Sequence, residues 1–425
     1  MSERVSKIAI AGVGTVGTGV LELLKKKLFY KNSKIVVTAI ASRRKINLDT
    51  FGLKKITLFK DAKNLINFND YDVLVELIGG DEGISKEIVF SALEKGKNVV
   101  TANKALVSKH WKKLYKLTTK NNNFIKYEAA VAGGIPIIKI LDDFLISNQI
   151  KRIYGILNGT SNFILTKMYE TNQNFKSILK QAQKLGYAES DPSFDVDGTD
   201  SAHKLSILSS LSFNIDCDIK TIHVEGIKNI NLTDLLYADE LGYKIKLLGI
   251  SEFFKKKLIN FVYPCLVEKD ELIAKVDDVY NGIVVESDFC NKSFFQGEGA
   301  GSKPTATSVL SDIISLSSKE LKSASPKKKN FETIDISKRF GSYYLRFSTI
   351  DKPGVISGIS NEFKNNNISM KSMLQKDKSK NTKHATIVVT THNCFEKDMR
   401  NALRRINNLG FILKKTTYIR IENFK

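Results

Sequence analysis

Residues 7–24, KIAIAGVGTVGTGVLELL, decide the fold of the amino-terminal part of the chain. Lys7–Ala11 predicts a short strand, and the apolar residues after Gly17 recur with the spacing of an amphipathic helix. Between them, Gly12 permits a tight turn, Gly14 lets backbone N–H groups approach a pyrophosphate, and Gly17 lets the helix pack closely on the strand. This order of strand, glycine turn and helix predicts a Rossmann dinucleotide-binding domain.

Further strands continue the same sheet and carry polar residues at their carboxyl ends. They are expected at residues 34–41, 71–78 and 98–101, with a helix at 84–95. Arg43 follows the first of these where NAD-selective folds usually carry an acid, so we expect it to bind a 2′-phosphate and favour NADP. Stacking of Arg43 on the adenine of either NAD or NADP is the alternative. Lys104 follows the last strand and is expected beside the nicotinamide, unless it is a surface lysine.

The second informative stretch, residues 184–210 (KLGYAESDPSFDVDGTDSAHKLSILSS), joins an acid-rich loop to the start of a helix. Glycine and proline residues place Glu189 and Asp195 on turns. Asp200 and Lys204 stand four residues apart and therefore share one helix face. In a chain of net charge +21, this loop predicts a site for a cationic ligand group with a lysine placed for proton transfer. A solvated acidic loop followed by an ordinary ion pair is the alternative.

The composition is that of a globular protein with two or three domains, because the chain has 425 residues, of which 42% are hydrophobic and 26% charged. We expect no nucleic-acid partner, since no nucleic-acid-binding motif accompanies the excess of lysine. We also expect no membrane span, and the first apolar run resembles a strand more than a signal peptide. The four cysteines form no C-x-x-C pair, which predicts a reduced, cytoplasmic protein without structural zinc.

The rest of the chain predicts an α+β domain on an open sheet, a linker and a small carboxyl-terminal module. Strands are expected at 124–130, 150–156, 222–227, 257–267 and 282–287, and helices at 174–185 and 237–247. Glu128, beside the small-residue turn that ends at Pro136, predicts either an oxygen-lined cation site or a simple turn. A second glycine turn, which contains Gly299, is expected to close the nicotinamide end of the cleft through its backbone. Residues 343–421 follow a βαββαβ pattern typical of a ferredoxin-like module.

Seven motifs, in order along the chain, carry a resemblance to one enzyme family. They are GVGTVG (12–17), TANKALV (101–107), YEAAVAGGIPII (127–138), GILNGTSNFIL (155–165), YAESDPSFDVDGTDSAHKL (187–205), GEGAG with PTA (297–306) and DKPGVISGIS (351–360). Across nearly its whole length the chain resembles homoserine dehydrogenase, in the long form that carries a C-terminal ACT domain. The resemblance implies reversible NAD(P)-dependent interconversion of L-aspartate 4-semialdehyde and L-homoserine, in the biosynthesis of threonine, methionine and isoleucine.

The same resemblance implies roles for single residues. Lys204 matches the proton donor and acceptor at the substrate oxygen, and Lys104 matches the second lysine at the reacting centre. Glu189 and Asp200 match substrate-binding carboxylates, to which the acid-rich loop adds Asp195. A sodium site is implied for Glu128 with the backbone of Val131, Gly133 and Ile135. Cofactor contacts are implied for Val13, Gly14, Thr15, Val16, Gly186 and Gly301, in addition to Gly12, Gly17, Arg43, Lys104 and Gly299.

The resemblance also implies a domain order and a mode of regulation. We expect a Rossmann domain at 1–130 (completed by about 297–318), a substrate-binding and dimerisation domain at 131–318, a linker at 319–340 and an ACT domain at 341–425. ACT modules normally bind an amino acid between paired copies, so threonine feedback and a homodimer or homotetramer are implied. Few contacts are expected to cross the linker.

Two other functions compete with this interpretation. One is another Rossmann amino-acid dehydrogenase that acts by oxidative deamination. The other is a non-catalytic amino-acid sensor, against which the intact Lys104, Lys204, Glu189 and first glycine turn argue.

Overall fold

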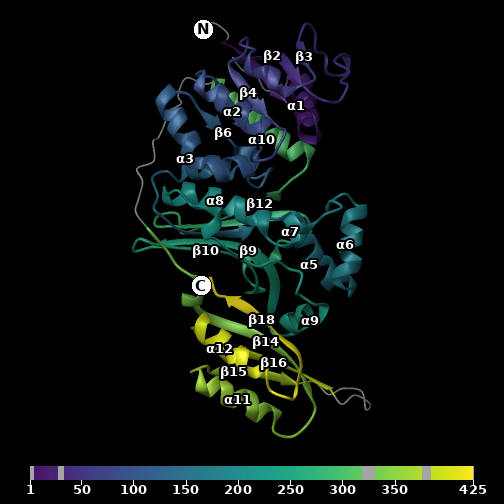
Figure 1. Ribbon diagram of the computed structural model, residues 1–425, viewed down its shortest axis with the longest axis vertical. Helices are drawn as coiled ribbons and strands as arrows, with labels where there is room; N and C mark the ends of the chain where they lie inside the picture. The colour runs from purple at the N-terminus through teal and green to yellow at the C-terminus, as the bar shows by residue number, and fades with distance from the viewer. Residues whose placement is uncertain (1–3, 27–32, 318–330, 376–383, 425) are drawn as a thin grey trace. The chain divides into compact units, whose positions relative to one another are not determined.

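The computed structural model describes residues 4–26, 33–317, 331–375 and 384–424 (Figure 1). It divides into two compact units. The first unit comprises Met1–Ile153, Ala202–Ile222 and Tyr280–Asn330. The second comprises Tyr154–Ser201, His223–Val279 and Phe331–Lys425. Each unit is therefore assembled from three separate stretches of the chain, and segments distant in the sequence share a core.

The first unit is built on a six-stranded sheet with strand order β3-β2-β1-β4-β5-β6. The strands are β1 (Arg4–Ala11), β2 (Ser33–Ala41), β3 (Thr57–Phe59), β4 (Val73–Glu76), β5 (Asn98–Thr101) and β6 (Ile125–Lys126). Every neighbouring pair runs parallel. The strand order reverses between β1 and β4, which is the point where open α/β sheets bind ligands beyond the carboxyl ends of their strands. The predicted Rossmann architecture is confirmed.

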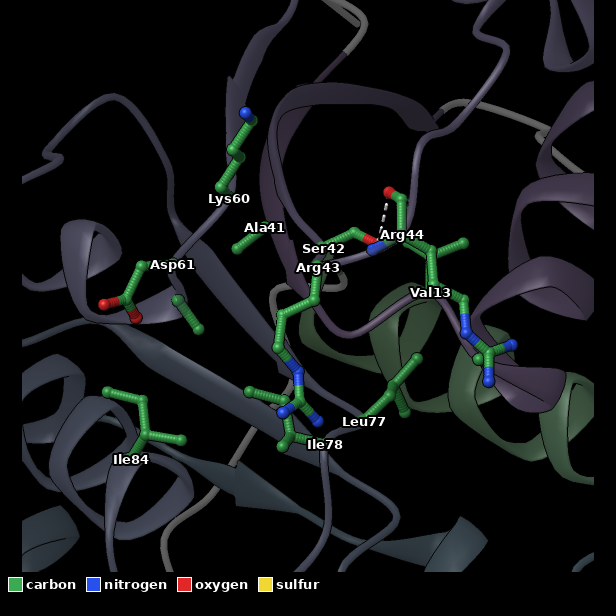
Figure 2. Close-up of a pocket in the computed structure, with 12 residues that line it drawn as sticks. Val13, Ala41, Ser42, Arg43, Arg44, Lys60, Asp61, Leu77, Ile78 and Ile84 are labelled. Carbon is green, nitrogen blue, oxygen red and sulfur yellow. Dashed lines mark hydrogen bonds between the residues drawn. The ribbon is translucent and has the colours of Figure 1, made fainter.

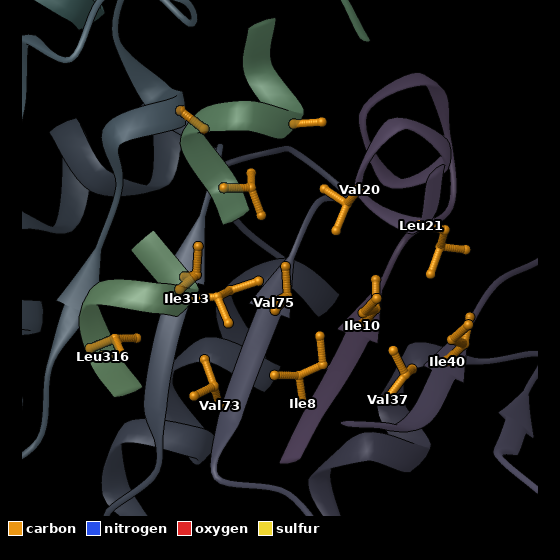
Figure 3. Packing of buried hydrophobic residues seen from close by; sticks show 14 residues of the cluster. Ile8, Ile10, Val20, Leu21, Val37, Ile40, Val73, Val75, Ile313 and Leu316 are labelled. Carbon is orange, nitrogen blue, oxygen red and sulfur yellow. The ribbon is translucent and has the colours of Figure 1, made fainter. Parts of the chain in front are cut away.

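Helices cover both faces of this sheet. They are α1 (Thr15–Lys26) and α10 (Ser302–Ser317) on one face, and α2 (Ile84–Glu94) and α3 (Lys104–Asn121) on the other. Successive side chains of β1 point to opposite faces, so Ile8 and Ile10 pack with Ile313 of α10, while Ala9 and Ala11 belong to the other layer (Figure 3). A strand covered on both sides is apolar throughout its covered part, as the run IAIA at residues 8–11 is.

Several shorter elements complete the first unit. They are α4 (Ile137–Lys139), the π-helical turn η4 (Ile140–Phe144), the hairpin of β11 (Tyr280–Ser287) and β12 (Lys292–Glu298), and most of α8 (Thr199–Phe213). The chain passes from the first unit to the second within β7 (Ile150–Ile156) and returns within α8. Of the helices in the described part of the chain, none combines the length and the apolar character needed to cross a membrane.

The second unit contains a sheet in which β10 pairs in parallel with β18 and with two short strands, and the other neighbours run antiparallel. Its strands, in spatial order, are β9 (Tyr243–Phe254), β10 (Lys257–Glu268), β18 (Ile412–Glu422), β14 (Phe340–Ile350), β16 (His384–Thr391) and β15 (Met370–Gln375). Helices α11 (Val355–Asn365) and α12 (Glu396–Ile406) pack on the carboxyl-terminal strands. The order β14-α11-β15-β16-α12-β18 is the βαββαβ pattern expected, and the ferredoxin-like module is confirmed.

Four local predictions are wrong in extent or type. Residues 237–247 were expected to be helical, but α9 (Leu232–Glu240) ends before Gly242, whose φ of 85° stops the helix, and β9 begins at Tyr243. The strands expected at 124–130 and 222–227 shrink to Ile125–Lys126 and to β8 (His223–Val224). The glycine-rich stretch from residue 294 onward, expected to be a turn, forms strand β12 as far as Glu298. Short apolar runs do not distinguish helix from strand by periodicity alone, and here the tertiary sheet decides.

The carboxyl-terminal module is not separated from the rest of its unit as the sequence predicts. Residues 319–330 of the expected linker lie outside the described residues, and its remainder contains β13 (Glu332–Thr333), which pairs with β10. The ring of Phe424 stacks on Tyr154 with ring centroids 3.8 Å apart. Arg346 donates to the buried carboxylate of Asp234 at 2.6 Å. The expectation that few contacts join the module to the preceding chain is therefore wrong.

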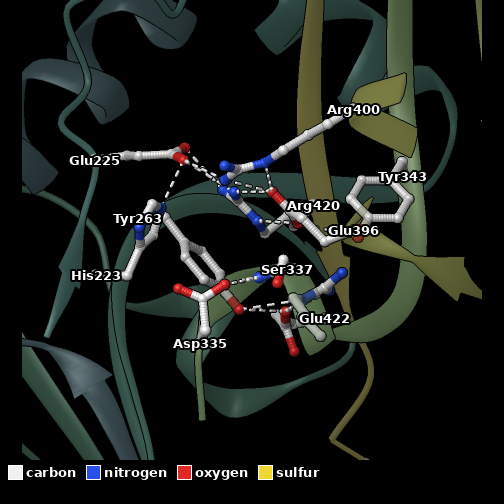
Figure 4. A network of polar contacts seen from close by, with 11 residues as sticks. His223, Glu225, Tyr263, Asp335, Ser337, Tyr343, Glu396, Arg400, Arg420 and Glu422 are labelled. Carbon is white, nitrogen blue, oxygen red and sulfur yellow. Dashed lines mark hydrogen bonds and ion pairs between the residues drawn. The ribbon is translucent and has the colours of Figure 1, made fainter. Parts of the chain in front are cut away.

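A buried charged network strengthens this junction (Figure 4). Arg420 of β18, which is 1% exposed, donates to both carboxylate oxygens of Glu225, at 2.8 and 2.9 Å, and also to Glu396. Burial by itself would raise the pKa of Glu225, but hydrogen bonds from His223 and Arg420 outweigh it and hold that pKa well below its ordinary value. Glu225 follows β8, so the network ties the carboxyl-terminal module to the middle segment of the unit.

Candidate active site

The first glycine turn connects β1 to α1 in the first unit and has the geometry of a dinucleotide cradle. Gly12 has a φ of 99°, and a side-chain carbon there would lie 2.8 Å from the carbonyl oxygen of Leu77. At Gly17 such an atom would lie 2.4 Å from the carbonyl oxygen of Gly12. Gly14, in contrast, faces open space. Two glycines are thus needed by the protein itself, and the third leaves the backbone open to a ligand at a helix N-terminus.

The other residues of this turn that were predicted to contact a cofactor lie in the same place. Val13 and Gly14 line a pocket, and Thr15 and Val16 form the first turn of α1. The hydroxyl of Ser302, the first residue of α10, donates to the carbonyl oxygen of Thr15 at 2.7 Å. The second glycine turn therefore lies against the first, and helices α1 and α10 begin side by side.

The pocket at the carboxyl ends of β1, β2 and β4 has a volume of about 670 Å³ (Figure 2). Its lining includes three cationic side chains, Arg43, Arg44 and Lys60, and one acidic side chain, Asp61. In Figure 2, the Arg43 side chain extends across the pocket toward Ile78. Lys60 was missed by the sequence reasoning, although its position directly after β3 could have indicated that it shares the edge at which Arg43 lies. The local excess of positive charge suits a phosphate-bearing ligand.

A buried carboxylate shapes the next two loops and was also missed. Glu76, at the end of β4, is 0% exposed and accepts from the N–H groups of Ile78 and Gly79 at 2.8 and 3.0 Å and from the hydroxyl of Thr101 at 2.6 Å. Asn103 caps α3 and donates to the carbonyl oxygen of Gly80 at 2.6 Å. These bonds fix the loop after β4 and the start of α3, where Lys104 is the first residue.

The two lysines predicted at the reacting centre lie on helices that touch each other. Lys104 opens α3, and Lys204 lies on α8 with 8% of its surface exposed. One turn after Lys104, the hydroxyl of Ser108 is 2.7 Å from Nδ1 of His203, the residue before Lys204. This contact brings together the helix turns that carry the two lysines.

In the second unit, two of the three predicted substrate carboxylates come together. Asp195 lies on α7 (Ser193–Val196), and Asp200 lies in the first turn of α8 and is 3% exposed. The side-chain amide of Asn158 donates to both, at 2.8 and 2.9 Å. Glu189 is exposed on the loop before α7, and its backbone carbonyl accepts from Gln183.

The Glu128 turn is buried and rich in oxygen atoms. The Glu128 carboxylate, 1% exposed, accepts from the N–H groups of Ile138 and Lys139 at 2.8 and 2.9 Å and so caps the N-terminus of α4. Burial raises the pKa of Glu128 to about 7, and neighbouring Asp312 adds to this effect. The carbonyl oxygen of Gly133 accepts from Ser308 at 2.5 Å, and that of Ile135 accepts from the N–H of Ile137 at 2.8 Å.

The donor atoms of this turn are all oxygen atoms. The expected ligands, Glu128 and the backbone of Val131, Gly133 and Ile135, are all oxygen atoms, as a hard cation requires. Within the described residues, no group of three or more His, Cys, Asp or Glu side chains is arranged to hold a metal. One carboxylate with carbonyl groups therefore suits a singly charged ion, although hydrogen bonds within the turn also explain it.

The remaining glycines predicted to contact the cofactor have roles in the fold. Gly186 follows α6 (Phe175–Lys184) in the second unit with a φ of 77°, the conformation that ends many helices. A side-chain carbon at Gly299 would lie 2.2 Å from the side chain of Asn281. Gly301 has a φ of 119° directly before α10. Their contacts with a cofactor stay predictions.

A separate pocket of about 500 Å³ lies in the carboxyl-terminal module. It forms between the end of β14, the first turn of α11 and parts of β15 and β16. Its lining includes Asp351, Lys352, Ser357 and Gln375. An acid and a base in one small pocket suit the ammonium and carboxylate groups of a free amino acid.

Comparison with known proteins agrees with these observations along the whole chain. Family models described as the homoserine dehydrogenase NAD-binding domain, homoserine dehydrogenase and the ACT domain match residues 12–128, 136–314 and 343–411. The homoserine dehydrogenase of Neisseria gonorrhoeae is 38% identical over 430 residues, covering 98% of each chain. That of Helicobacter pylori is 39% identical over 432 residues, covering 100% of each.

Solved structures give the same result. A homoserine dehydrogenase from Thiobacillus denitrificans has a TM-score of 0.91 at 34% identity and covers 99% of each chain. A hyperthermophilic archaeal homoserine dehydrogenase in complex with NADPH has a TM-score of 0.63 at 27% identity, covering 73% of this chain and 97% of that one. The chain therefore belongs to the homoserine dehydrogenase family, and it is an oxidoreductase with a nicotinamide-nucleotide-binding domain and a carboxyl-terminal ACT domain.

Proposed function

We propose that the chain interconverts L-aspartate 4-semialdehyde and L-homoserine with NADP, in the pathway to threonine, methionine and isoleucine. The observation that carries this proposal is the pair Asp195 and Asp200 on one amide, with Lys204 one helical turn beyond Asp200. An α-ammonium group needs anionic partners, and an alcohol that becomes a carbonyl needs a nearby group to take its proton. Asp200 and Lys204, one turn apart on α8, supply an anionic partner and a proton-transfer group.

The proposed roles of the residues follow from their chemistry. Asp195, Asp200 and, from the preceding loop, Glu189 bind the substrate ammonium group. Lys204 accepts the hydroxyl proton during oxidation of homoserine and returns it to the carbonyl oxygen in the reverse direction. Lys104 stabilises the charge that develops on the same oxygen. The bound nicotinamide nucleotide supplies the hydride acceptor.

The preference for NADP is supported by the charge of the pocket. Arg43, Arg44 and Lys60 line it, and a guanidinium binds a phosphate through two parallel hydrogen bonds. Gly14 leaves room for the pyrophosphate at the start of α1. The cofactor residues Val13, Thr15, Val16, Gly186, Gly299 and Gly301 are proposed as backbone contacts.

A sodium ion and a threonine effector complete the proposal. Glu128, with the backbone of Val131, Gly133 and Ile135, would hold sodium, and activity in sodium chloride should exceed that in choline chloride for the wild type but not for Glu128→Gln. Threonine is proposed to bind the pocket that contains Asp351 and Lys352, between ACT modules paired in a homodimer or homotetramer. The four cysteines of the described chain form no disulfide, which supports a reduced, cytoplasmic location.

One spectrophotometric assay tests the function. Purified protein is given homoserine with NADP or NAD, and reduced nicotinamide is followed by absorbance. We expect reduction of NADP that requires homoserine and no ammonia release. Ammonia release with an amino-acid substrate would identify an oxidatively deaminating dehydrogenase instead, and amino-acid binding without turnover would identify a sensor.

A further inference from the structure

Asn158 lies where β7 ends and α5 (Gly159–Thr171) begins, and its side chain is engaged at both ends. Its Oδ1 accepts from the N–H of Ser161 at 2.7 Å, which caps the helix. Its Nδ2 donates to Oδ1 of Asp195 at 2.8 Å and to Oδ2 of Asp200 at 2.9 Å. The residue is 5% exposed, so its bonds are shielded from water. A helix cap needs only the first of these bonds.

The hydrogen-bond partners leave one orientation for this amide. If the amide were turned over, its carbonyl oxygen would face two carboxylates and its NH₂ group would face the N–H of Ser161. Each of these contacts would be repulsive. The cap therefore fixes the NH₂ group toward Asp195 and Asp200, and the start of α5 determines where the two carboxylates lie.

Two more bonds hold the acid-rich loop to the same helix turn. The hydroxyl of Ser161 donates to the backbone carbonyl of Asp195 at 3.0 Å, and the hydroxyl of Thr160 donates to that of Tyr187 at 2.7 Å. The first turn of α5 thus contacts the loop at both of its ends. Asn158 is the member of this turn that reaches the two acidic side chains.

An amide is well suited to this position. Two carboxylates that share one donor repel each other, so the pair needs hydrogen-bond donors to stay close. A lysine would supply them but would cancel one negative charge, whereas an amide supplies two N–H groups and leaves both charges in place. We propose that Asn158 is a positioning residue that holds Asp195 and Asp200 together as a preformed anionic site for the substrate ammonium group. This inference rests on the proposed function.

The first test replaces the amide but keeps the cap. Serine is also a preferred helix cap, so Asn158→Ser retains the bond to Ser161 and loses the donors to the two carboxylates. The KM for homoserine should rise about tenfold or more, while kcat falls less than about threefold and the Kd for NADP does not change, since a charge-assisted hydrogen bond is worth roughly 1.5–3 kcal/mol. A KM within twofold of wild type would overturn the proposal, and so would equal losses of homoserine and NADP affinity.

The chain offers a matched control in the same unit. Asn174 caps α6 by accepting from the N–H of Ser177 at 3.0 Å, in the same Asn-x-x-Ser arrangement, but it is exposed. Asn174→Ser should leave the KM for homoserine at its wild-type value. If both variants raised KM equally, the effect of Asn158→Ser would come from helix capping, and the positioning role would be wrong.

A double-mutant cycle asks whether Asn158 acts through the acids. Asp195→Asn removes one carboxylate, and the KM of the double variant with Asn158→Ser should then lie well below the product of the two single effects, because only the bond to Asp200 is left to lose. If the KM of the double variant rose by the product of the two single factors, Asn158 would act independently of Asp195. This result would overturn the proposal.

Hydrogen exchange separates failure of this inference from failure of the proposed function. A wild-type chain that does not oxidise homoserine would refute the proposed function. Hydrogen exchange would still test the positioning role, because the measurement does not need enzymatic activity. Backbone amides of residues 195–200 should exchange at least about tenfold faster in Asn158→Ser than in wild type or Asn174→Ser, because local opening costs less once the anchoring bonds are lost. Equal exchange in all three proteins would overturn the positioning role.

Discussion

At the scale of single residues, Lys204 is the proposed proton-transfer group. Lys204→Ala removes an amine that is 8% exposed on α8 and leaves the nucleotide pocket of the first unit intact. General acid–base groups contribute about 10²–10⁴ in rate, so kcat should fall by that factor while NADP affinity stays within a few-fold. Steady-state kinetics with homoserine and fluorescence titration with NADPH measure the two quantities.

The control for this variant is Lys220→Ala, which removes an exposed lysine from the short helix after α8 and should behave as wild type. A Lys204→Ala protein that kept more than about a third of wild-type turnover would rule out the general-acid–base role, since such a group is worth far more.

Arg43 decides the expected choice of cofactor. Arg43→Asp removes a guanidinium from the pocket and adds an acceptor for a ribose hydroxyl, so kcat/KM for NADP should fall about tenfold or more while that for NAD rises. Lys63→Asp makes the same charge change at an exposed position near the pocket and should alter both cofactors little. Equal losses with NADP and NAD would indicate that Arg43 stacks on the adenine.

At the scale of secondary-structure elements, the short turn η4 carries a partly buried acid, Asp142, at a cost to stability. Burial raises the pKa of Asp142 to about 6, and the nearby carboxylates of Asp143 and Asp312 add to this shift. The folded-state pKa thus exceeds that of an unfolded aspartate, about 3.9. The protonated Asp142 therefore contributes its full share to the free energy of unfolding below about pH 4. This share is lost as the pH rises through about 6.

Asp142→Asn should remove this pH dependence. At pH 8 the variant should be more stable than wild type by about 1–2 kcal/mol, and near pH 4 the two should unfold alike. Thermal unfolding at the two pH values measures the difference. Asp143→Asn, at an exposed neighbouring position, should have a much smaller effect. A stability difference that does not change with pH would show that Asp142 is not the titrating group.

The same scale explains which elements were predictable. The strand at residues 98–101 and that at 150–156 match β5 and β7, because apolar runs bounded by polar or turn residues predict buried strands. The sequence of residues 243–254 did not predict a strand, since a strand that is buried on both faces lacks the alternation of polar and apolar residues. Its neighbour β10, which begins after a turn at Lys255 and Lys256 with positive φ, makes β9 a strand.

At the scale of the whole molecule, the carboxyl-terminal module should be indispensable for the second unit. A chain that ends at residue 330 loses β18 and β14 and leaves the edge of β10, the ring of Tyr154 and the carboxylate of Asp234 without their partners. Breaking a buried ion pair alone costs about 3–5 kcal/mol, which is comparable with the stability of a typical domain. We expect the shortened chain to aggregate and to lack a cooperative unfolding transition, as measured by size-exclusion chromatography and circular dichroism.

Phe424→Ala in the full chain is the graded control. It removes one stacked ring that is 1% exposed and should lower stability by about 3–5 kcal/mol without changing the oligomeric state. A shortened chain with wild-type solubility and homoserine turnover would show that the module is dispensable, as the predicted linker implied.

The sequence by itself determined the family, the Rossmann sheet, the ferredoxin-like module and the site candidates, because glycine turns, helix spacing and ordered motifs are local properties of the chain. Only the tertiary structure showed that Lys60 lines the same pocket as Arg43, that Glu76 accepts from the Gly79 loop and that Asn158 joins Asp195 to Asp200. Asn158 lies 37 residues from Asp195 and 42 from Asp200, and a single polar side chain leaves no periodic pattern in the sequence. What brings them together is the pairing of strands and the burial of helices, which no single segment encodes.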